Sequence, residues 1–214
     1  KLSITAANTR LIHLGSTKKS TWKIMTKRYI DAQQLLDDSY NLGLQIMDSG
    51  CRPNYIIGVW RGGTPVGIAV QELLDFFDIK CDHISIRTSS YTGIAERVSN
   101  VRVHGLDYII KNVNAEDTLL IVDDVYDSGL SVAQVIQDLE RKCRKNTPIM
   151  KIATPYYKPT NNKTGRAPDF YLYETDEWLV FPHELSGLTK SELLNDKPGI
   201  ISTLRERIKE MKED

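Results

Sequence analysis

Short apolar runs alternate with segments of helical periodicity along most of the chain. The runs that we predict as strands are residues 55–60, 83–88, 118–124, 148–157, 169–173 and 178–181. Apolar side chains at intervals of three and four residues predict helices over 31–49, 65–77 and 129–144, and from residue 200 onward. Strands that alternate with helices favour an α/β fold, in which helices cover both faces of a mainly parallel sheet.

Capping residues mark where the first two helices begin and end. Asp31 precedes the first helical pattern as an N-cap, and Gly50 follows it as a stop. Thr64 and Pro65 predict that the second helix is capped by the threonine and starts at the proline.

Two further segments are distinctive. Residues 89–105 are polar, weakly periodic and long for a connection, which is typical of a functional lid or a hairpin. In the C-terminal tail, Leu204, Ile208 and Met211 share one helical face, so we expect this helix to pack against the protein.

Composition excludes several classes of function. The 214 residues suit one domain with appendages, and 28 basic residues balance 28 acidic ones, so we expect no nucleic-acid partner and no attraction to an anionic membrane. No apolar run approaches the ~20 residues that span a bilayer. The three cysteines and four histidines show no metal or redox spacing, which suits buried thiols and a reducing cytoplasm.

The first two dozen residues are basic, rich in serine and threonine, and free of acidic residues until Asp31. This composition is compatible with a targeting segment or with a simple N-terminal extension. We favour the extension, because Met25 directly precedes the first strongly patterned segment.

Two glycine-containing turns follow predicted strands, at 61–64 and 128–131. In parallel sheets, ligands bind beyond the carboxyl ends of the strands, so both turns are candidate site segments. The second turn follows Asp123 and Asp124, which point to opposite faces of a strand and therefore suit two tasks around one ligand. The backbone N–H groups, two hydroxyls and helix N-terminus of 128–131 form a candidate phosphate cradle, although an acidic turn with a serine N-cap would have the same composition.

The stretch "IVDDVYDSGLSV" (121–132) resembles the diphosphate-sugar signature of the type I phosphoribosyltransferases. That signature is a hydrophobic run, two acids, two variable residues and Asp-Thr-Gly-x-Thr. Ser128 and Ser131 replace the two threonines and keep the hydroxyls that bind phosphate. The resemblance assigns the ribose diol and the magnesium shell to Asp123 and Asp124. It assigns the 5'-phosphate to Ser128, Gly129, Leu130 and Ser131.

Asp127 sharpens the resemblance, because the family branch that acts on 6-oxopurines has an aspartate at this position. By that match, Asp127 is the catalytic general base toward purine N7, and the acid in the reverse direction. An aspartate that caps the loop is the structural alternative.

A second motif, "GVWRGGTPVG" (58–67), resembles the family's pyrophosphate loop. Arg61 would supply charge to the diphosphate, and Gly62 would let the backbone approach it closely. The resemblance also implies a cis peptide between Trp60 and Arg61. Taken alone, Arg-Gly-Gly is a weak motif, and an exposed turn arginine is its default explanation.

A third motif, "DEWLVFPHE" (176–184), resembles the purine-binding strand of the xanthine-guanine branch. It implies that Trp178 stacks on the purine, that the backbone of Leu179 binds the ring edge, and that Glu184 lies near a second metal. Lys158 matches the lysine that donates to the purine 6-oxygen. Without the resemblance, Trp178 would be assigned to the core and Lys158 to the solvent.

Ser90 and Tyr91 match the Ser-Tyr pair of the family's mobile loop, so 89–105 would be a lid that shields the reacting sugar from water. The resemblance covers about residues 30–185. It divides the chain into an N-terminal extension (1–28), a phosphoribosyltransferase domain (29–185) and a C-terminal helical appendage (186–214). The implied fold is that of the family, with a small hood and a flexible lid.

The resemblance implies a cytoplasmic purine-salvage enzyme that uses Mg²⁺ and forms a homo-oligomer, either a dimer or a tetramer. Its partners would be 5-phosphoribosyl 1-diphosphate and a 6-oxopurine: guanine, hypoxanthine or xanthine. The alternative is a non-catalytic regulator that keeps the fold and senses the donor or nucleotides. Such regulators typically lose the base-pocket residues, which this sequence retains. A phosphoacceptor receiver domain is disfavoured. Such a domain has its acidic pair near its start, whereas the pair in this chain lies more than half-way along the sequence.

Overall fold

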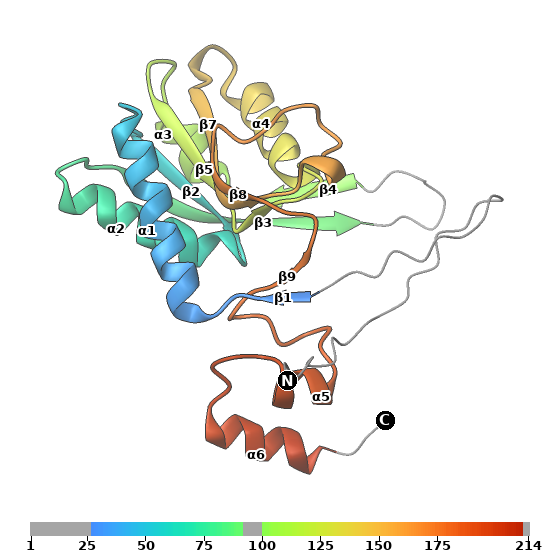
Figure 1. The fold of residues 1–214 in the computed structure, drawn as a ribbon. Helices are drawn as coiled ribbons and strands as arrows, with labels where there is room; N and C mark the ends of the chain where they lie inside the picture. The colour runs from blue at the N-terminus through green and yellow to red at the C-terminus, as the bar shows by residue number, and fades with distance from the viewer. Residues whose placement is uncertain (1–26, 92–99, 212–214) are drawn as a thin grey trace. The chain divides into compact units, whose positions relative to one another are not determined.

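The structure is a computed structural model that describes residues 27–91 and 100–211. Figure 1 shows its helices and strands in chain order. The strands are β1 (Lys27–Tyr29), β2 (Tyr55–Trp60), β3 (Asp82–Tyr91), β4 (Asn100–His104), β5 (Thr118–Val122), β6 (Val125–Tyr126), β7 (Ile149–Tyr157), β8 (Phe170–Glu174) and β9 (Trp178–Val180). The α-helices are α1 (Ala32–Asp48), α2 (Gly63–Phe76), α3 (Asp107–Asn112), α4 (Leu130–Cys143), α5 (Lys190–Asn195) and α6 (Ser202–Glu210).

The chain forms two compact units. The larger unit is Leu36–Asp176, and the smaller unit combines the chain before Leu36 with the chain from Glu177 onward. The domain boundaries that the sequence suggested, at 28/29 and 185/186, stay a prediction. Residues 1–26 of the predicted extension lie outside the described residues.

The larger unit is built on a seven-stranded sheet with the order β4-β3-β2-β5-β7-β6, and β8 also pairs with β7. All pairings are parallel except β3 with β4. This confirms the predicted α/β class with a mainly parallel sheet. The β3–β4 pair also makes 89–105 a hairpin in its described part, and its residues 92–99 lie outside the described residues.

Alternate residues of the central strands pack under different helices. Ile57 and Ile121 face a core cluster that includes Ile109 of α3 and Val135 of α4. On the other face, a Cβ added to Gly67 of α2 would lie 3.5 Å from the Cα of Gly58, so this helix lies almost on the strand backbone. This double burial explains why the strands read as continuous apolar runs.

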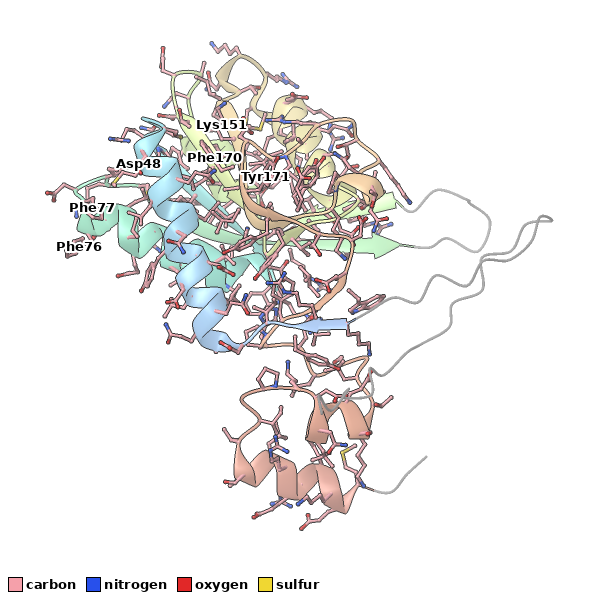
Figure 2. The ribbon with its side chains drawn as sticks, in the orientation of Figure 1. Asp48, Phe76, Phe77, Lys151, Phe170 and Tyr171 are labelled. Carbon is pink, nitrogen blue, oxygen red and sulfur yellow. The ribbon has the colours of Figure 1, made fainter. Side chains whose placement is uncertain are left out.

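The second helix differs from its prediction at both ends. It begins at Gly63 after Gly62 as N-cap, and no side chain caps it, so Thr64 is not the cap and Pro65 is not the first helical position. At the other end, the helix stops at Phe76, and Phe77 is the C-cap and is 47% exposed. Figure 2 shows Phe76 and Phe77 together at this end of α2.

The smaller unit contains a two-stranded parallel sheet of β1 and β9, in which Lys27 pairs with Trp178. Thr189 and Glu192 form a capping box at the start of α5, and the Glu192 carboxylate also pairs with Lys27. In α6, Ile208 is buried as predicted, but Met211 is 63% exposed, because it follows the end of the helix.

None of the helices within residues 27–91 and 100–211 is long and apolar enough to cross a membrane. All three cysteines are free thiols. Cys143 is buried as expected, whereas Cys51 and Cys81 are partly exposed. Burial nonetheless raises the pKa of Cys81 to about 11, so its thiol stays protonated and unreactive at neutral pH.

Asp169, which directly precedes β8, forms hydrogen bonds with residues of β7. Its Oδ1 accepts a hydrogen bond from Lys151 Nζ at 2.9 Å, and its Oδ2 accepts from the Ile152 backbone N at 2.9 Å. Lys151 and the neighbouring Phe170 are labelled in Figure 2. Burial raises the pKa of Asp169, but these hydrogen bonds and Arg166 outweigh it, so the net pKa is lowered.

We therefore expect Asp169→Asn to lower the free energy of unfolding at pH 7 by about 2 kcal/mol, because charge-assisted hydrogen bonds are lost. A lowered carboxyl pKa stabilises the protein above the usual aspartate pKa, and this stabilisation disappears as the pH falls through the folded-state value. Urea denaturation should show the two proteins converging in acid. A difference of equal size at acidic and neutral pH would contradict this assignment.

Candidate active site

The acidic pair and the Arg-Gly-Gly turn meet at the carboxyl ends of β2 and β5. These strands are neighbours in parallel register, with Gly58 beside Val122. A Cβ on Gly63 would lie 2.7 Å from the Asp123 Cα and still closer to the Val122 carbonyl oxygen. The two segments are therefore in direct backbone contact, although about sixty positions separate them in the sequence.

Gly62 has a structural role besides the diphosphate-binding role that the sequence suggested, which stays a prediction. A Cβ at this position would overlap the Asp124 carboxylate, with Oδ1 at 2.8 Å and Oδ2 closer. The missing side chain thus makes room for the protein's own carboxylate. The preceding peptide, Trp60–Arg61, is cis, as the resemblance implied, and Arg61 is exposed at the turn.

The two carboxylates are fixed by the backbone around them. The Asp124 backbone N donates to Asp123 Oδ1 at 3.0 Å, and the Val125 backbone N donates to Asp124 Oδ1 at 2.9 Å. Burial, followed by the adjacent Asp124 charge, raises the pKa of Asp123 well above its usual range. A cation placed at this pair would relieve both effects, so the pair is chemically suited to a hard metal ion.

The described residues contain no group of three or more His, Cys, Asp or Glu side chains that could hold a metal ion. Mg²⁺ characteristically keeps waters and substrate oxygens as ligands, so two carboxylates are sufficient protein ligands for it. Glu184 lies in the smaller unit, where its Oε2 accepts a hydrogen bond from the Phe181 backbone N at 3.0 Å. Its metal role stays a prediction.

The Ser128–Ser131 turn has the geometry of a helix N-terminus. Gly129 is the N-cap of α4 and has a φ of 74°, which favours glycine. A Cβ at Gly129 would also lie 2.7 Å from the Tyr126 ring, which forms the floor of the turn. The Ser128 hydroxyl accepts a weak hydrogen bond from the Leu130 N at 3.4 Å. Helix α4 points its positive dipole end at this turn, as an anion site requires.

Asp127 and Lys158 form an ion pair beyond these strand ends, with Lys158 Nζ 3.4 Å from Asp127 Oδ2. The two-residue strand β6 brings them together, because it pairs with the end of β7, and the Lys158 backbone N donates to the Tyr126 carbonyl at 2.9 Å. The Lys158 side chain is 7% exposed and that of Asp127 is 47% exposed. Lys158 is therefore not the solvated lysine that its residue type alone suggests.

The remaining predicted residues lie elsewhere in the chain. Trp178 and Leu179 are on β9 of the smaller unit; Leu179 is buried, whereas Trp178 is 47% exposed and so is not a core residue. Ser90 and Tyr91 end strand β3. The purine-binding and lid roles of these four residues stay predictions.

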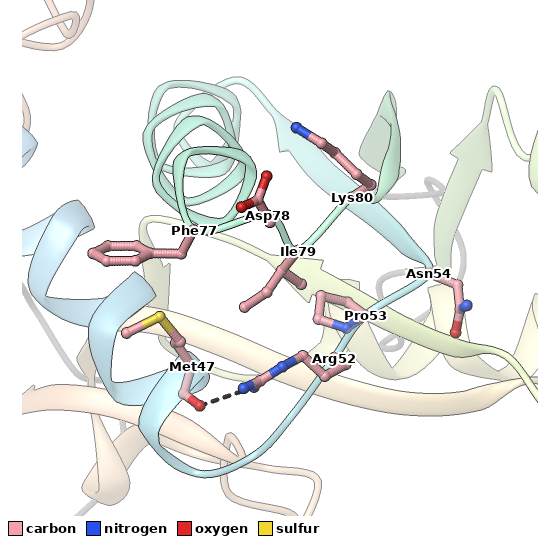
Figure 3. A pocket seen from close by; sticks show the side chains of 8 residues that line it. All are labelled: Met47, Arg52, Pro53, Asn54, Phe77, Asp78, Ile79 and Lys80. Atoms are coloured by element: carbon pink, nitrogen blue, oxygen red, sulfur yellow. Dashed lines mark hydrogen bonds between the residues drawn. The ribbon is translucent and has the colours of Figure 1, made fainter.

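A hollow of about 490 Å³ lies away from these residues (Figure 3). It is lined at the amino end of β2 by Arg52, Pro53 and Asn54, and by the segment 77–80 after α2. The Arg52 guanidinium donates to the Met47 carbonyl at 2.9 Å, and this carbonyl at the end of α1 also accepts from the Gly50 backbone N at 3.1 Å. Parallel strands place ligands at their carboxyl ends, so the acidic edge is the candidate site.

Solved structures with a similar fold include purine phosphoribosyltransferases. A purine phosphoribosyltransferase from Pyrococcus horikoshii Ot3 is 27% identical, with a TM-score of 0.57 over 76% of this chain and 97% of that chain. The Helicobacter pylori xanthine-guanine-hypoxanthine phosphoribosyltransferase is 22% identical, with a TM-score of 0.56 over 72% of this chain and 92% of that chain. A hypothetical protein from Neisseria gonorrhoeae with bound ppGpp is 17% identical, with a TM-score of 0.62 over 77% and 92% of the two chains.

No family model matches the sequence, and no curated protein matches it. The fold is nevertheless that of the type I phosphoribosyltransferases, and the resemblance that the sequence motifs carry is confirmed.

The contact between Gly63 and the acidic strand end gives a direct test. We expect Gly63→Ala to lower the free energy of unfolding by about 3 kcal/mol, because the methyl group would overlap backbone atoms that cannot rotate away. Gly67→Ala is the matched control in the same helix, where the added methyl would meet only ordinary contacts. It should be neutral or stabilising by up to about 1 kcal/mol. Equal urea midpoints for the two variants would show that the close contact is absent.

Proposed function

We propose that this protein, which has the fold of the type I phosphoribosyltransferases, transfers the 5-phosphoribosyl group of 5-phosphoribosyl 1-diphosphate to a 6-oxopurine. The products are the nucleoside monophosphate and pyrophosphate. The substrate would be guanine, hypoxanthine or xanthine. The 27% identity to a purine phosphoribosyltransferase and the shared fold support the reaction class, and the Asp127–Lys158 pair supports the choice of base.

The ion pair between Asp127 and Lys158 is the observation that carries the proposal. A 6-oxopurine presents O6 and N7 side by side on one edge of the ring. An ammonium donates to O6, and an adjacent carboxylate takes a proton from N7 as N9 attacks the sugar. The 3.4 Å separation of the two groups suits two neighbouring atoms of one ring edge.

The same pair disfavours adenine. Adenine has a 6-amino group, which is a donor, in place of the 6-oxygen. The ammonium of Lys158 has no acceptor lone pair, so adenine would leave two donors facing each other next to a largely buried lysine. Leaving buried donors without acceptors costs binding free energy, so a site of this kind rejects the wrong base strongly.

The donor would lie across the strand ends of β2 and β5. Arg61 and the Gly62 backbone would bind the diphosphate, Asp123 and Asp124 the ribose hydroxyls and Mg²⁺, and the turn 128–131 the 5'-phosphate. A bound Mg²⁺ would supply charge neutralisation for the departing diphosphate. The chain's own residues then hold the sugar in line and move one proton at Asp127.

A screen of free bases tests the proposal. Purified protein with the donor and Mg²⁺ should release pyrophosphate when guanine, hypoxanthine or xanthine is added, and far more slowly with adenine or orotate. The absence of pyrophosphate release with every base would favour the regulator alternative. Turnover with adenine or orotate alone would refute the assignment of the base.

Asp127→Asn tests the assignment of the proton acceptor. We expect it to lower kcat by about 10²- to 10⁴-fold, the usual range for a general base, while donor affinity stays nearly unchanged. Asp78→Asn is a suitable control, because Asp78 has a positive φ that asparagine also tolerates and lies in the turn before β3. Near-normal kcat in Asp127→Asn would exclude Asp127 as the base.

A further inference from the structure

A second segment, residues 162–166, lies beside the Ser128–Ser131 turn, and the sequence motifs do not include it. After β7 the chain passes Lys158 and returns along 162–166, and the Lys163 backbone N donates to the Ser128 carbonyl at 3.0 Å. This bond places Lys163 directly beside the Ser128–Ser131 turn. Ser128 and Lys163 lie in the same compact unit.

Side-chain hydrogen bonds connect residues 162–166 to the Tyr126 and Tyr157 side chains next to the turn. The hydroxyls of Thr164 and Tyr126 are 3.0 Å apart, and Thr164 Oγ1 also donates to Asn162 Oδ1 at 2.9 Å. Asn162 Nδ2 donates to the Tyr157 hydroxyl at 3.0 Å. The Tyr126 ring lies under Gly129 and packs edge-on against Tyr157, with 5.8 Å between ring centroids. Lys163 thus lies in a segment that is tied to both sides of the turn.

The charges around the turn need a cation. Asp123, Asp124 and Asp127 lie just before the turn in the chain, so their negative charges oppose the binding of a phosphate there. Two nearby cations have other partners in the proposed reaction, since Arg61 would bind the diphosphate and Lys158 the base. Lys163 is exposed and forms no ion pair with any residue that the structure describes.

We propose that Lys163 is a further phosphate-binding residue, whose ammonium neutralises the 5'-phosphate held by the Ser128–Ser131 turn. This inference rests on the proposed function and adds to it a residue outside the family motif. The backbone bond to Ser128 fixes where the lysine starts, and its flexible stem lets the ammonium reach over the phosphate. The same lysine would also compensate for serines in place of threonines, because a charge contact does not depend on the extra methyl groups.

The test compares a ligand that has the phosphate with one that lacks it. Calorimetry on the full chain would measure guanosine 5'-monophosphate and guanosine binding to the wild type, Lys163→Gln and Lys163→Arg. We expect Lys163→Gln to weaken the nucleotide by about tenfold, the lower range of a charge-assisted hydrogen bond, and to leave guanosine unchanged. Lys163→Arg should restore most of the affinity, and the loss should shrink in high salt.

Lys111→Gln is the matched control. Lys111 is also exposed, but it lies in the last turn of α3, whose end contacts the amino end of β2 through Tyr55 and Asn112. Unchanged nucleotide binding in Lys163→Gln would overturn the inference, as would an equal loss for guanosine or for Lys111→Gln. Unfolding midpoints would verify that each variant is folded. A separate result would contradict the proposed function: the wild-type protein would release no pyrophosphate with any base.

Discussion

The close contact between the Arg-Gly-Gly turn and the acidic end of β5 is the constraint on which the site depends. It requires β2 and β5 to be adjacent and parallel, and it requires two glycines where their Cβ atoms would overlap Asp123, Asp124 and Val122. Helix α2 must then begin immediately, at Gly63, which leaves no place for a threonine cap. One steric requirement therefore sets the strand order, the start of a helix and the position of both carboxylates.

This arrangement is costly in the absence of ligands. Two adjacent carboxylates share a partly buried strand end, and the raised pKa of Asp123 reflects the cost of keeping both ionised. The surrounding sheet is stable enough to hold them, because its central strands are buried on both faces by apolar side chains. Binding of a cation and a polyhydroxylated substrate would convert this unfavourable electrostatic energy into affinity.

Much of the fold follows from local sequence, because buried parallel strands are apolar runs and their ends carry the polar site residues. The strands β2, β5 and β7 and the two turns at 61–64 and 128–131 were predicted on this basis. The elements that were missed are short and include β6, with two residues, and α3, with six, too few to show a period. The roles of Gly62 and Tyr126 were not predictable either, because both depend on contacts between segments that are distant along the chain or stacked in space.

The two-residue strand β6 also sets a fixed length. It precedes the Ser128–Ser131 turn, and the carbonyl of its last residue, Tyr126, accepts a hydrogen bond from the Lys158 backbone N. Lys158, which would bind the base, follows the donor of this hydrogen bond in the chain. The Ser128–Ser131 turn, which would bind the phosphate, follows its acceptor. The distance between the Ser128–Ser131 turn and Lys158 is therefore fixed by the backbone. In the proposed reaction, one backbone hydrogen bond would thus hold the phosphate-binding groups and the base-binding lysine at a fixed separation.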